Sequence, residues 1–401
     1  MIEKEKVEKH IGVLDGVRAI AMIIVVWYHF WQQSWLTPMV KLPSGFVNIS
    51  KYIGLTSINL DGFVRYGFSF VDLLILLSAF CNFYPYARSI LLDEPWPDAK
   101  TFYKKRAVRI LPSYYLSLLL SLIVMIGEGT ALKGAVWKDL FAHIFCIAPF
   151  FPETYLSPYF NGVLWTVQIE VLYYVLMPWL AWLFRKWPVV TSVGLWGCGL
   201  ISANYIFYNQ VDNIRNYVNN MFTFAGCYAN GMLLCMLYIT WKKKNIENTY
   251  TRLIATIVAF LSLLHISSML KQLGQGELQV VQLQQRFELS FAFSCLVLAL
   301  PFACRAVKVL FDNPMLRFVA AISYNWYIWH QYIAVKLKEY HVPYWEGDTP
   351  PNITGDRVWM WKYQILIIVV SVLVATILTY GFEKPIAKKL LRNKASRTVS
   401  S

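Results

Sequence analysis

The stretch IGVLDGVRAIAMIIVVWYHFWQ occupies residues 11–32 and is apolar along nearly its whole length. A run of about 20 apolar residues in a helix is long enough to cross the hydrocarbon core of a bilayer. The exceptions in this stretch are the charged residues Asp15 and Arg18 and the imidazole of His29. It therefore predicts a membrane-spanning helix that carries a few ionisable groups.

Similar apolar stretches recur along all 401 residues. The composition is 57% hydrophobic and 16% aromatic, and 15% of the residues are charged, whereas soluble proteins carry about 25%. This excludes a soluble enzyme, a disulfide-stapled secreted module and a disordered tail protein. We predict an all-α polytopic membrane protein of about ten transmembrane helices. The predicted spans are residues 11–32, 66–87, 110–127, 161–184, 188–208, 217–241, 253–270, 287–304, 318–335 and 363–382.

The net charge of +14 is distributed unevenly over the two sides of this topology. With the N-terminus in the cytoplasm, 24 Lys and Arg residues fall in internal segments and 12 in external ones, and Arg18 is the remaining one of 37. This asymmetry follows the positive-inside rule. Both termini are therefore predicted to be cytoplasmic, and the basic charge gives no reason to expect a nucleic-acid partner.

One apolar segment, residues 137–151, is too short for a comfortable span. A crossing there would also move the basic cluster 242–244 outside, so we predict a re-entrant or interfacial segment. The organisation is then a cytoplasmic N-terminus (1–10), one membrane domain (11–382) and a basic cytoplasmic tail (383–401). The seven cysteines form no close CxxC pair, so neither disulfides nor a metal site are predicted.

Ionisable residues within spans are candidates for function, because a charge at mid-bilayer costs about 2.5–3.5 kcal/mol. Arg18 and His29 are eleven residues apart, so both project from one helical face with ~16 Å between them. Asp15 lies one turn before Arg18 and is expected to hold its guanidinium group. The structural alternative is an arginine that reaches the interface and a histidine hydrogen-bonded to a neighbouring helix.

A pair of arginines marks the predicted cytoplasmic start of the third span. In the sequence FYKKRAVRILPSYYL, Arg106 and Arg109 share a helical face. Arginine forks bind phosphate oxygens bidentately, so the pair predicts a phosphate-binding site. Positive-inside topology alone is the structural alternative for these charges.

Glu170 lies near the middle of its predicted span, where a carboxylate is neutral or needs a cationic partner. Tyr173 and Tyr174 follow within one turn and are expected to hydrogen-bond it. His330, in ISYNWYIWHQYIA, is similarly deep.

Two further ionisable residues have less informative surroundings. Asp72, in FVDLLILLSAF, needs a partner, and both a structural and a functional role are open. His265 has no comparable polar neighbours and is predicted to be a satisfied packing residue. The external loops are rich in aromatic residues, as expected at a membrane interface or on a carbohydrate platform.

These segments, in this order, resemble the acyltransferase-3 family of integral-membrane acyltransferases over roughly residues 10–390. The family motifs are an arginine and a histidine with ten residues between them, an Arg-x-x-Arg, a Trp-Ser-Leu-x-x-Glu-like stretch, a Ser-Tyr…Tyr-Leu…His motif and a Glu-x-Pro. They are matched in turn by Arg18 and His29; Arg106 and Arg109; Trp165, Thr166 and Glu170; Ser323, Tyr324, Tyr327 and His330; and Glu383 and Pro385. The chain departs from the family at Leu74 and Ile75, which replace aromatic residues, at Ala79, which replaces glycine, and at Thr166, which replaces serine.

The resemblance implies transfer of an acyl group, commonly acetyl, from cytoplasmic acyl-CoA to a hydroxyl of an exported glycan, glycolipid or lipid-linked sugar. It implies that Arg18, Arg106 and Arg109 bind the CoA phosphates and that acyl-CoA is a substrate with no permanently bound cofactor. His29 is the expected general base, and an acyl-histidine relay is a variant. Glu170 and His330 are expected to orient or tune that imidazole, or to position the acceptor. No SGNH-type esterase sequence is recognised, so we expect the membrane domain to complete the transfer, by default in a bacterial inner membrane.

Two other classes of protein are compatible with buried ionisable residues. A secondary transporter or flippase would use His29, Glu170 and His330 as a proton relay. It would depend on a proton gradient and need no acyl-CoA, and it does not explain the paired arginines. In a membrane scaffold, Arg18, His29 and Glu170 would affect only stability.

Overall fold

The computed structural model describes residues 8, 10–36, 39–41, 57–130, 133–155, 159–209 and 214–392. Most of the predicted N-terminal segment 1–10 and the end of the tail 383–401 lie outside the described residues. In the described part, ten α-helices have 19 or more residues. They are α2 (Gly12–Ser34), α5 (Phe70–Leu92), α6 (Ala99–Gly127), α9 (Leu164–Lys186), α10 (Pro188–Asn209), α12 (Ala225–Lys243), α13 (Thr249–Gln272), α14 (Leu278–Ala299), α16 (Pro314–Glu339) and α18 (Arg357–Ile377).

Eight of these described helices are long and apolar enough to cross a membrane, so the predicted number of ten is not confirmed. The exceptions, α12 and α16, occupy the predicted spans 217–241 and 318–335. In α16, Ser323, Asn325 and His330 are buried, and the helix packs against α2 and α18. A helix whose polar side chains face other helices does not need an apolar surface throughout. The protein is therefore a multi-pass, all-helical bundle.

The third long helix begins eleven residues before its predicted span, at Ala99 instead of 110. Its N-cap residue Asp98 accepts a hydrogen bond from the Thr101 amide at 2.8 Å, which satisfies one free donor of the first turn. The Arg-x-x-Arg motif consequently lies within a continuous helix. Hydropathy predicts only the part of a helix that lies in hydrocarbon, so it misses polar helical extensions.

The remaining elements are short. In the predicted re-entrant segment, the helix α7 (Gly134–Ile144) is about 16 Å long, roughly half the hydrocarbon thickness. Strands β1 (Met39–Lys41) and β2 (Ser57–Asn59) pair in antiparallel orientation. The short helices are α4 (Asp61–Arg65), η2 (Gly67–Ser69), α7 (Gly134–Ile144), η4 (Ala148–Phe150), α8 (Pro152–Tyr155), α11 (Ile214–Tyr217), η6 (Leu300–Phe302), α15 (Arg305–Phe311), α17 (Pro351–Thr354), the π-helix η7 (Leu378–Glu383) and α19 (Lys384–Arg392).

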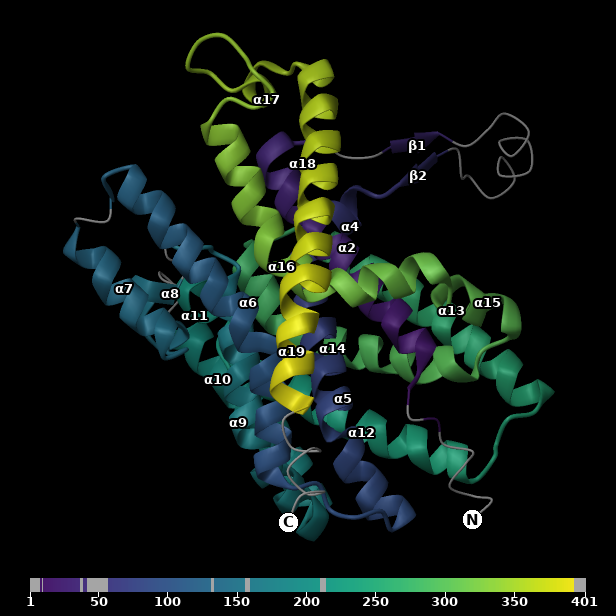
Figure 1. The fold of residues 1–401 in the computed structure, drawn as a ribbon. Coiled ribbons are helices and arrows are strands. Elements are labelled where there is room, and N and C mark those ends of the chain that lie inside the picture. Colours follow the sequence, from purple (N-terminus) through teal and green to yellow (C-terminus); the bar gives the residue numbers. More distant parts are fainter. Residues whose placement is uncertain are drawn as a thin grey trace.

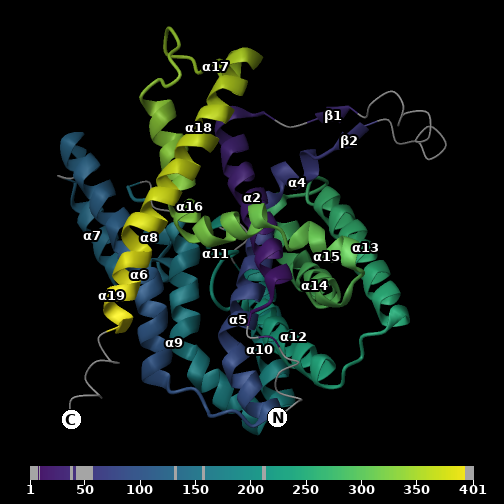
Figure 2. The same ribbon diagram turned by 45° about the vertical axis from the view of Figure 1, so that its right-hand side comes forward.

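Helix α2 lies in the middle of the bundle, with α6 and α7 on one side and α13 and α15 on the other (Figures 1 and 2). The most extensive helix contacts join α5 to α12 and α16 to both α2 and α18. Helices α5 and α12 approach so closely that a Cβ atom on Gly231 would overlap Leu76 and Ala79. Ala79, which replaces the glycine of the resembled family, is thus accommodated by a glycine on the facing helix.

The start of α2 is packed just as closely against the turn that precedes α16. A Cβ atom on Gly16 would overlap the carbonyl oxygen of Phe311. Because backbone atoms cannot rotate away, we expect Gly16→Ala to destabilise the protein by about 1–3 kcal/mol or more. The measurement is the midpoint of thermal unfolding in detergent. Gly194→Ala on α10 is the control, since nothing lies within 4 Å of its Cβ position, and an unchanged midpoint in Gly16→Ala would contradict this packing.

Candidate active site

A cavity of about 510 Å³ lies among helices α2, α5, α6, α9 and α16. Four arginines line it, from three different helices: Arg18 on α2, Arg106 and Arg109 on α6, and Arg317 on α16. The carboxylates that line it are those of Asp15 and Glu170. Cationic side chains therefore outnumber carboxylates in the lining, which suits an anionic ligand.

The structure brings seven of the twelve predicted site residues to this cavity. They are Asp15, Arg18, Arg106, Arg109, Glu170, Tyr174 and Tyr327. The arginines of α2 and α6, far apart in sequence, meet around one space. Arg317 was not singled out from the sequence, because a single arginine at a predicted cytoplasmic helix start is explained by topology alone.

Arg18 and Asp15 do not pair in the way expected from their spacing. The Nη2 group of Arg18 donates to the Cys81 sulfur on α5 at 3.2 Å. The carboxylate of Asp15 lies 2.8 Å from the Nε2 atom of His10. Asp15 therefore holds the segment before α2, and Arg18 reaches across to α5.

Arg106 is fixed by two aromatic rings. Its guanidinium carbon lies 5.4 Å from the ring centroid of Phe102 and 5.5 Å from that of Tyr174. Contacts of this kind attract the cation without using its hydrogen-bond donors. The fork remains available to phosphate oxygens.

Glu170 is bound by hydroxyl groups from two helices. Its Oε1 atom accepts a hydrogen bond from Ser78 at 2.6 Å and another from Tyr174. The prediction that Tyr173 also binds this carboxylate is wrong. The hydroxyl of Tyr173 donates to the Met221 carbonyl at 2.5 Å, since neighbouring helical residues point about 100° apart.

His29 and His330 lie next to one another with their rings stacked. The ring centroids are 4.9 Å apart and the planes differ by 12°. The Nδ1 atom of His330 lies 3.0 Å from the Trp326 carbonyl oxygen and 2.6 Å from that of Tyr327. Carbonyl oxygens only accept hydrogen bonds, so this nitrogen carries the proton and Nε2 keeps its lone pair.

The other nitrogens of this histidine pair are buried and have no hydrogen-bond partner among the described residues. They are both nitrogens of His29 and Nε2 of His330. Glu170 therefore does not orient His29 through a hydrogen bond, contrary to one of the expected roles. Buried polar atoms without partners are rare, and here they leave basic nitrogens available to a substrate.

Tyr327 contacts both the cavity and the histidine pair. Thr166 and Tyr327 line the cavity, and the Thr166 hydroxyl donates to the Tyr327 hydroxyl at 2.6 Å. The Tyr327 ring centroid lies 5.6 Å from that of His330, and neither histidine lines the cavity. The replacement of serine by Thr166 thus keeps the hydroxyl that this contact uses.

Trp165, a predicted supporting residue, does not line the cavity. The ring of Trp165 contacts Tyr155 and Phe224, with centroid distances of 5.8 and 6.2 Å. His265 is also not the packed residue that was expected. Its side chain is 50% exposed and its Nε2 atom lies 3.0 Å from Glu288, so it belongs to an exposed face of the bundle.

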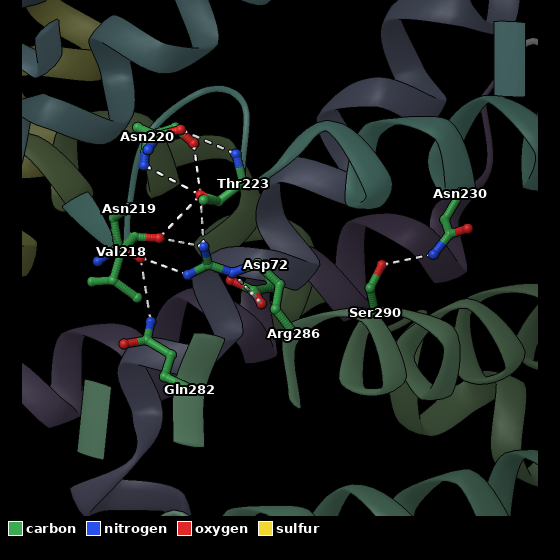
Figure 3. Close-up of polar contacts among 9 residues, drawn as sticks. All are labelled: Asp72, Val218, Asn219, Asn220, Thr223, Asn230, Gln282, Arg286 and Ser290. Carbon is green, nitrogen blue, oxygen red and sulfur yellow. Dashed lines mark hydrogen bonds and ion pairs between the residues drawn. The ribbon is translucent and has the colours of Figure 1, made fainter. Parts of the chain in front are cut away.

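Asp72 has a buried partner that the sequence did not suggest. Arg286 on α14 is only 4% exposed, and its Nε group donates to Asp72 at 3.3 Å (Figure 3). The predicted span 287–304 left Arg286 in an external segment, whereas α14 begins at Leu278 and buries it. The partner that Asp72 was expected to need is therefore a buried arginine of another helix.

The guanidinium group of Arg286 also forms hydrogen bonds with the connection between α10 and α12. Its Nη1 group donates to the Val218 carbonyl at 2.5 Å and to the Thr223 hydroxyl at 2.8 Å, and Nη2 donates to Asn219 at 2.6 Å (Figure 3). Its carbon also lies 4.2 Å from the centroid of the Phe224 ring. Asp72 and Arg286 thus link α5, α14 and this connection.

The model of a family described as an acyltransferase domain matches residues 11–381 of the chain. The chain belongs to this acyltransferase-3 family. Membership confirms the resemblance of the motifs and does not favour the transporter interpretation. The family match covers every cavity-lining arginine as well as the histidine pair.

Several curated proteins are similar to this member of the acyltransferase-3 family. A candidate O-acetyltransferase of Staphylococcus aureus (strain COL) is 24% identical over 365 residues, 86% of this chain and 54% of the relative. The O-acetyltransferase OatA of Staphylococcus aureus (strain NCTC 8325 / PS 47) is 24% identical over 97% of this chain and 59% of its own length. The acyltransferase MdmB of Streptomyces mycarofaciens is 29% identical over 100 residues, 24% of this chain and 25% of MdmB.

The chain spans 54% of the length of the first of these relatives. No solved structure shows significant similarity to this chain.

Proposed function

We propose that this protein is a membrane O-acyltransferase that moves an acyl group, most simply acetyl, from acyl-CoA to a hydroxyl of an exported glycan or glycolipid. The observation that carries the proposal is a cavity lined by four arginines and by Tyr327, whose ring contacts one of two stacked histidines with unpartnered nitrogens. The names of the Staphylococcus aureus relatives support acetyl as the group and oxygen as the acceptor atom. The charge asymmetry of the chain supports an orientation with the arginines facing the cytoplasm, and the bacterial relatives support a bacterial cytoplasmic membrane.

In this proposal the arginines bind the phosphates of the donor. Arg106 and Arg109 are three residues apart on α6, so their forks point to the same side and suit neighbouring phosphates. Arg18 faces them from α2 in the same cavity. The uncharged pantetheine arm then extends through the cavity towards Thr166 and Tyr327.

The pantetheine arm has to span the distance between the arginines that bind the phosphates and His29, and α2 sets this distance. Arg18 and His29 are separated by eleven residues of one continuous helix, which corresponds to ~16 Å, about half the hydrocarbon thickness. For the thioester to reach His29, the hydrogen bond between Thr166 and Tyr327 must open or Tyr327 must turn aside. The donor thus enters from one face of the membrane and the acceptor approaches from the other.

The transfer step itself needs a base and no bound cofactor. A free nitrogen of His29 takes the proton of the acceptor hydroxyl while the oxygen attacks the thioester carbonyl. The carbon–oxygen bond forms, the carbon–sulfur bond breaks, and the proton passes from the imidazole to the CoA thiolate. His330, fixed as the Nδ1–H tautomer, presents a second lone pair beside the reacting groups.

Acetyl-CoA binding to the purified protein in detergent tests the donor site without knowledge of the acceptor. We expect Arg106→Ala and Arg18→Ala each to weaken binding roughly 10- to 100-fold, the effect of losing one charge-assisted hydrogen bond. Lys105→Ala is the control, because Lys105 is exposed on the same helix and does not line the cavity. Failure of the folded wild-type protein to bind any short acyl-CoA would contradict the proposal.

A further inference from the structure

The fourth arginine of the cavity, Arg317, belongs to none of the family motifs named above. Arg317 is in the first turn of α16, and its side chain is 57% exposed. It therefore lies at the rim of the cavity, as does the exposed Arg109, whereas Arg18 and Arg106 are partly buried in its wall. A cation at the rim meets the part of a ligand that does not enter the cavity.

Arg317 is held in one orientation by a neighbouring carboxylate. Its Nε and Nη2 groups both lie 2.7 Å from Oδ1 of Asp312. This uses one edge of the guanidinium and leaves the edge that carries Nη1 available to a ligand. The Asp312 carboxylate also packs closely against Gly12 at the start of α2.

The ligand of the proposed function carries its phosphates in two separate places. Coenzyme A carries a diphosphate that is joined directly to the pantetheine arm and a separate 3′-phosphate on the ribose. With the arm inside the cavity, the diphosphate meets Arg106 and Arg109, and the adenosine stays at the rim. A planar fork with one free edge suits the dianionic oxygens of a phosphate monoester.

We propose that Arg317, positioned by Asp312, recognises the 3′-phosphate of coenzyme A and makes the enzyme select CoA thioesters over thioesters that lack this phosphate. This inference rests on the proposed function, since it assigns a part of the same donor site. The enzyme would thereby discriminate against acetyl-dephospho-CoA and acetyl-phosphopantetheine, which share the thioester and the arm.

The test compares the binding of acetyl-CoA and acetyl-dephospho-CoA to the full-length purified protein and three variants. We expect the wild type to bind acetyl-CoA on the order of tenfold more tightly, the value of one charge-assisted contact at an exposed site. Arg317→Gln should lose this preference by weakening acetyl-CoA alone. Arg106→Gln should weaken both ligands equally, and Arg305→Gln, an exposed residue of α15 outside the cavity lining, should change neither.

The outcomes separate this inference from the proposed function. Equal binding of both ligands to the wild type, or equal weakening of both by Arg317→Gln, would overturn the role of Arg317 and leave the donor site intact. Failure of the wild type to bind either ligand would overturn both. Retained binding of acetyl-dephospho-CoA by Arg317→Gln shows at the same time that this variant is folded.

Discussion

Replacing His29 with alanine should abolish acyl transfer while acetyl-CoA binding stays at its wild-type level. General-base catalysis typically contributes about 10²–10⁴-fold, so we expect the rate to fall by at least 10²-fold. Binding should persist because His29 does not line the cavity that holds the arginines. The measurement is the rate of label transfer from radioactive acetyl-CoA to membrane glycans, with the dissociation constant for acetyl-CoA determined on the same preparation.

Arg106→Ala is the matched comparison for His29→Ala, because it should lose acetyl-CoA binding and therefore also lose transfer.

His330→Ala distinguishes the role of His330 from that of His29. If His29 is the base, His330→Ala should retain measurable transfer, since it removes a stacked neighbour and leaves the His29 nitrogens in place. Near-normal transfer by His29→Ala would remove His29 from the mechanism.

Breaking the ion pair between Asp72 and Arg286 should have the largest effect on stability. Removing one partner leaves the other charge buried and unpaired, which typically costs about 3–5 kcal/mol. Arg286→Ala in addition frees the carbonyl of Val218 and the side chains of Asn219 and Thr223. We therefore expect a clear fall in the midpoint of thermal unfolding in detergent, larger than that caused by Gly16→Ala.

A paired replacement tests whether the cost arises from the unpaired charge. Asp72→Leu combined with Arg286→Leu leaves no buried charge and should recover part of the stability lost in each single variant. If the effects of the two single variants simply add in the double variant, the two side chains are not energetically coupled. Single variants that unfold at the wild-type temperature would show that the pair contributes nothing.

Much of the helical layout is predictable from the sequence, because apolar length is a strong signal. Each of the ten predicted spans overlaps one of the ten long helices, but the predicted spans leave out polar residues at the ends of several helices. Arg286, at the start of α14, is one of the residues left out. From the sequence, an arginine just before an apolar run is predicted to lie in a loop. Only the packing of α14 against α5 shows that Arg286 is buried beside Asp72.

The donor side of the site was predictable because the arginines and Glu170 belong to recognisable motifs. The directions of individual side chains were not. Tyr173 and Tyr174 are consecutive, and which of them meets Glu170 depends on how α9 is rotated against α5. In the same way, the partner of Arg18 is decided by the packing of α2 on α5, which places Cys81 nearest.

The separation between the cavity and the histidine pair also lies beyond sequence reasoning. Thr166 and Tyr327 are on different helices, and their hydrogen bond exists only because α9 and α16 approach each other there. The stacking of His29 on His330 likewise requires contact between α2 and α16. Motifs could predict that these residues act together, but not which of them face the donor cavity.

Transfer across a sealed membrane tests the central claim most directly. The purified protein would be placed in proteoliposomes with radioactive acetyl-CoA added to the side that carries the α6 arginines, and with membrane glycans and glycolipids on the other side. We predict that label appears on the far side as an alkali-labile ester, and that neither His29→Ala nor Arg106→Ala produces it. Far-side substrate that moves across the membrane unacylated, driven by a proton gradient and without acetyl-CoA, would contradict the account.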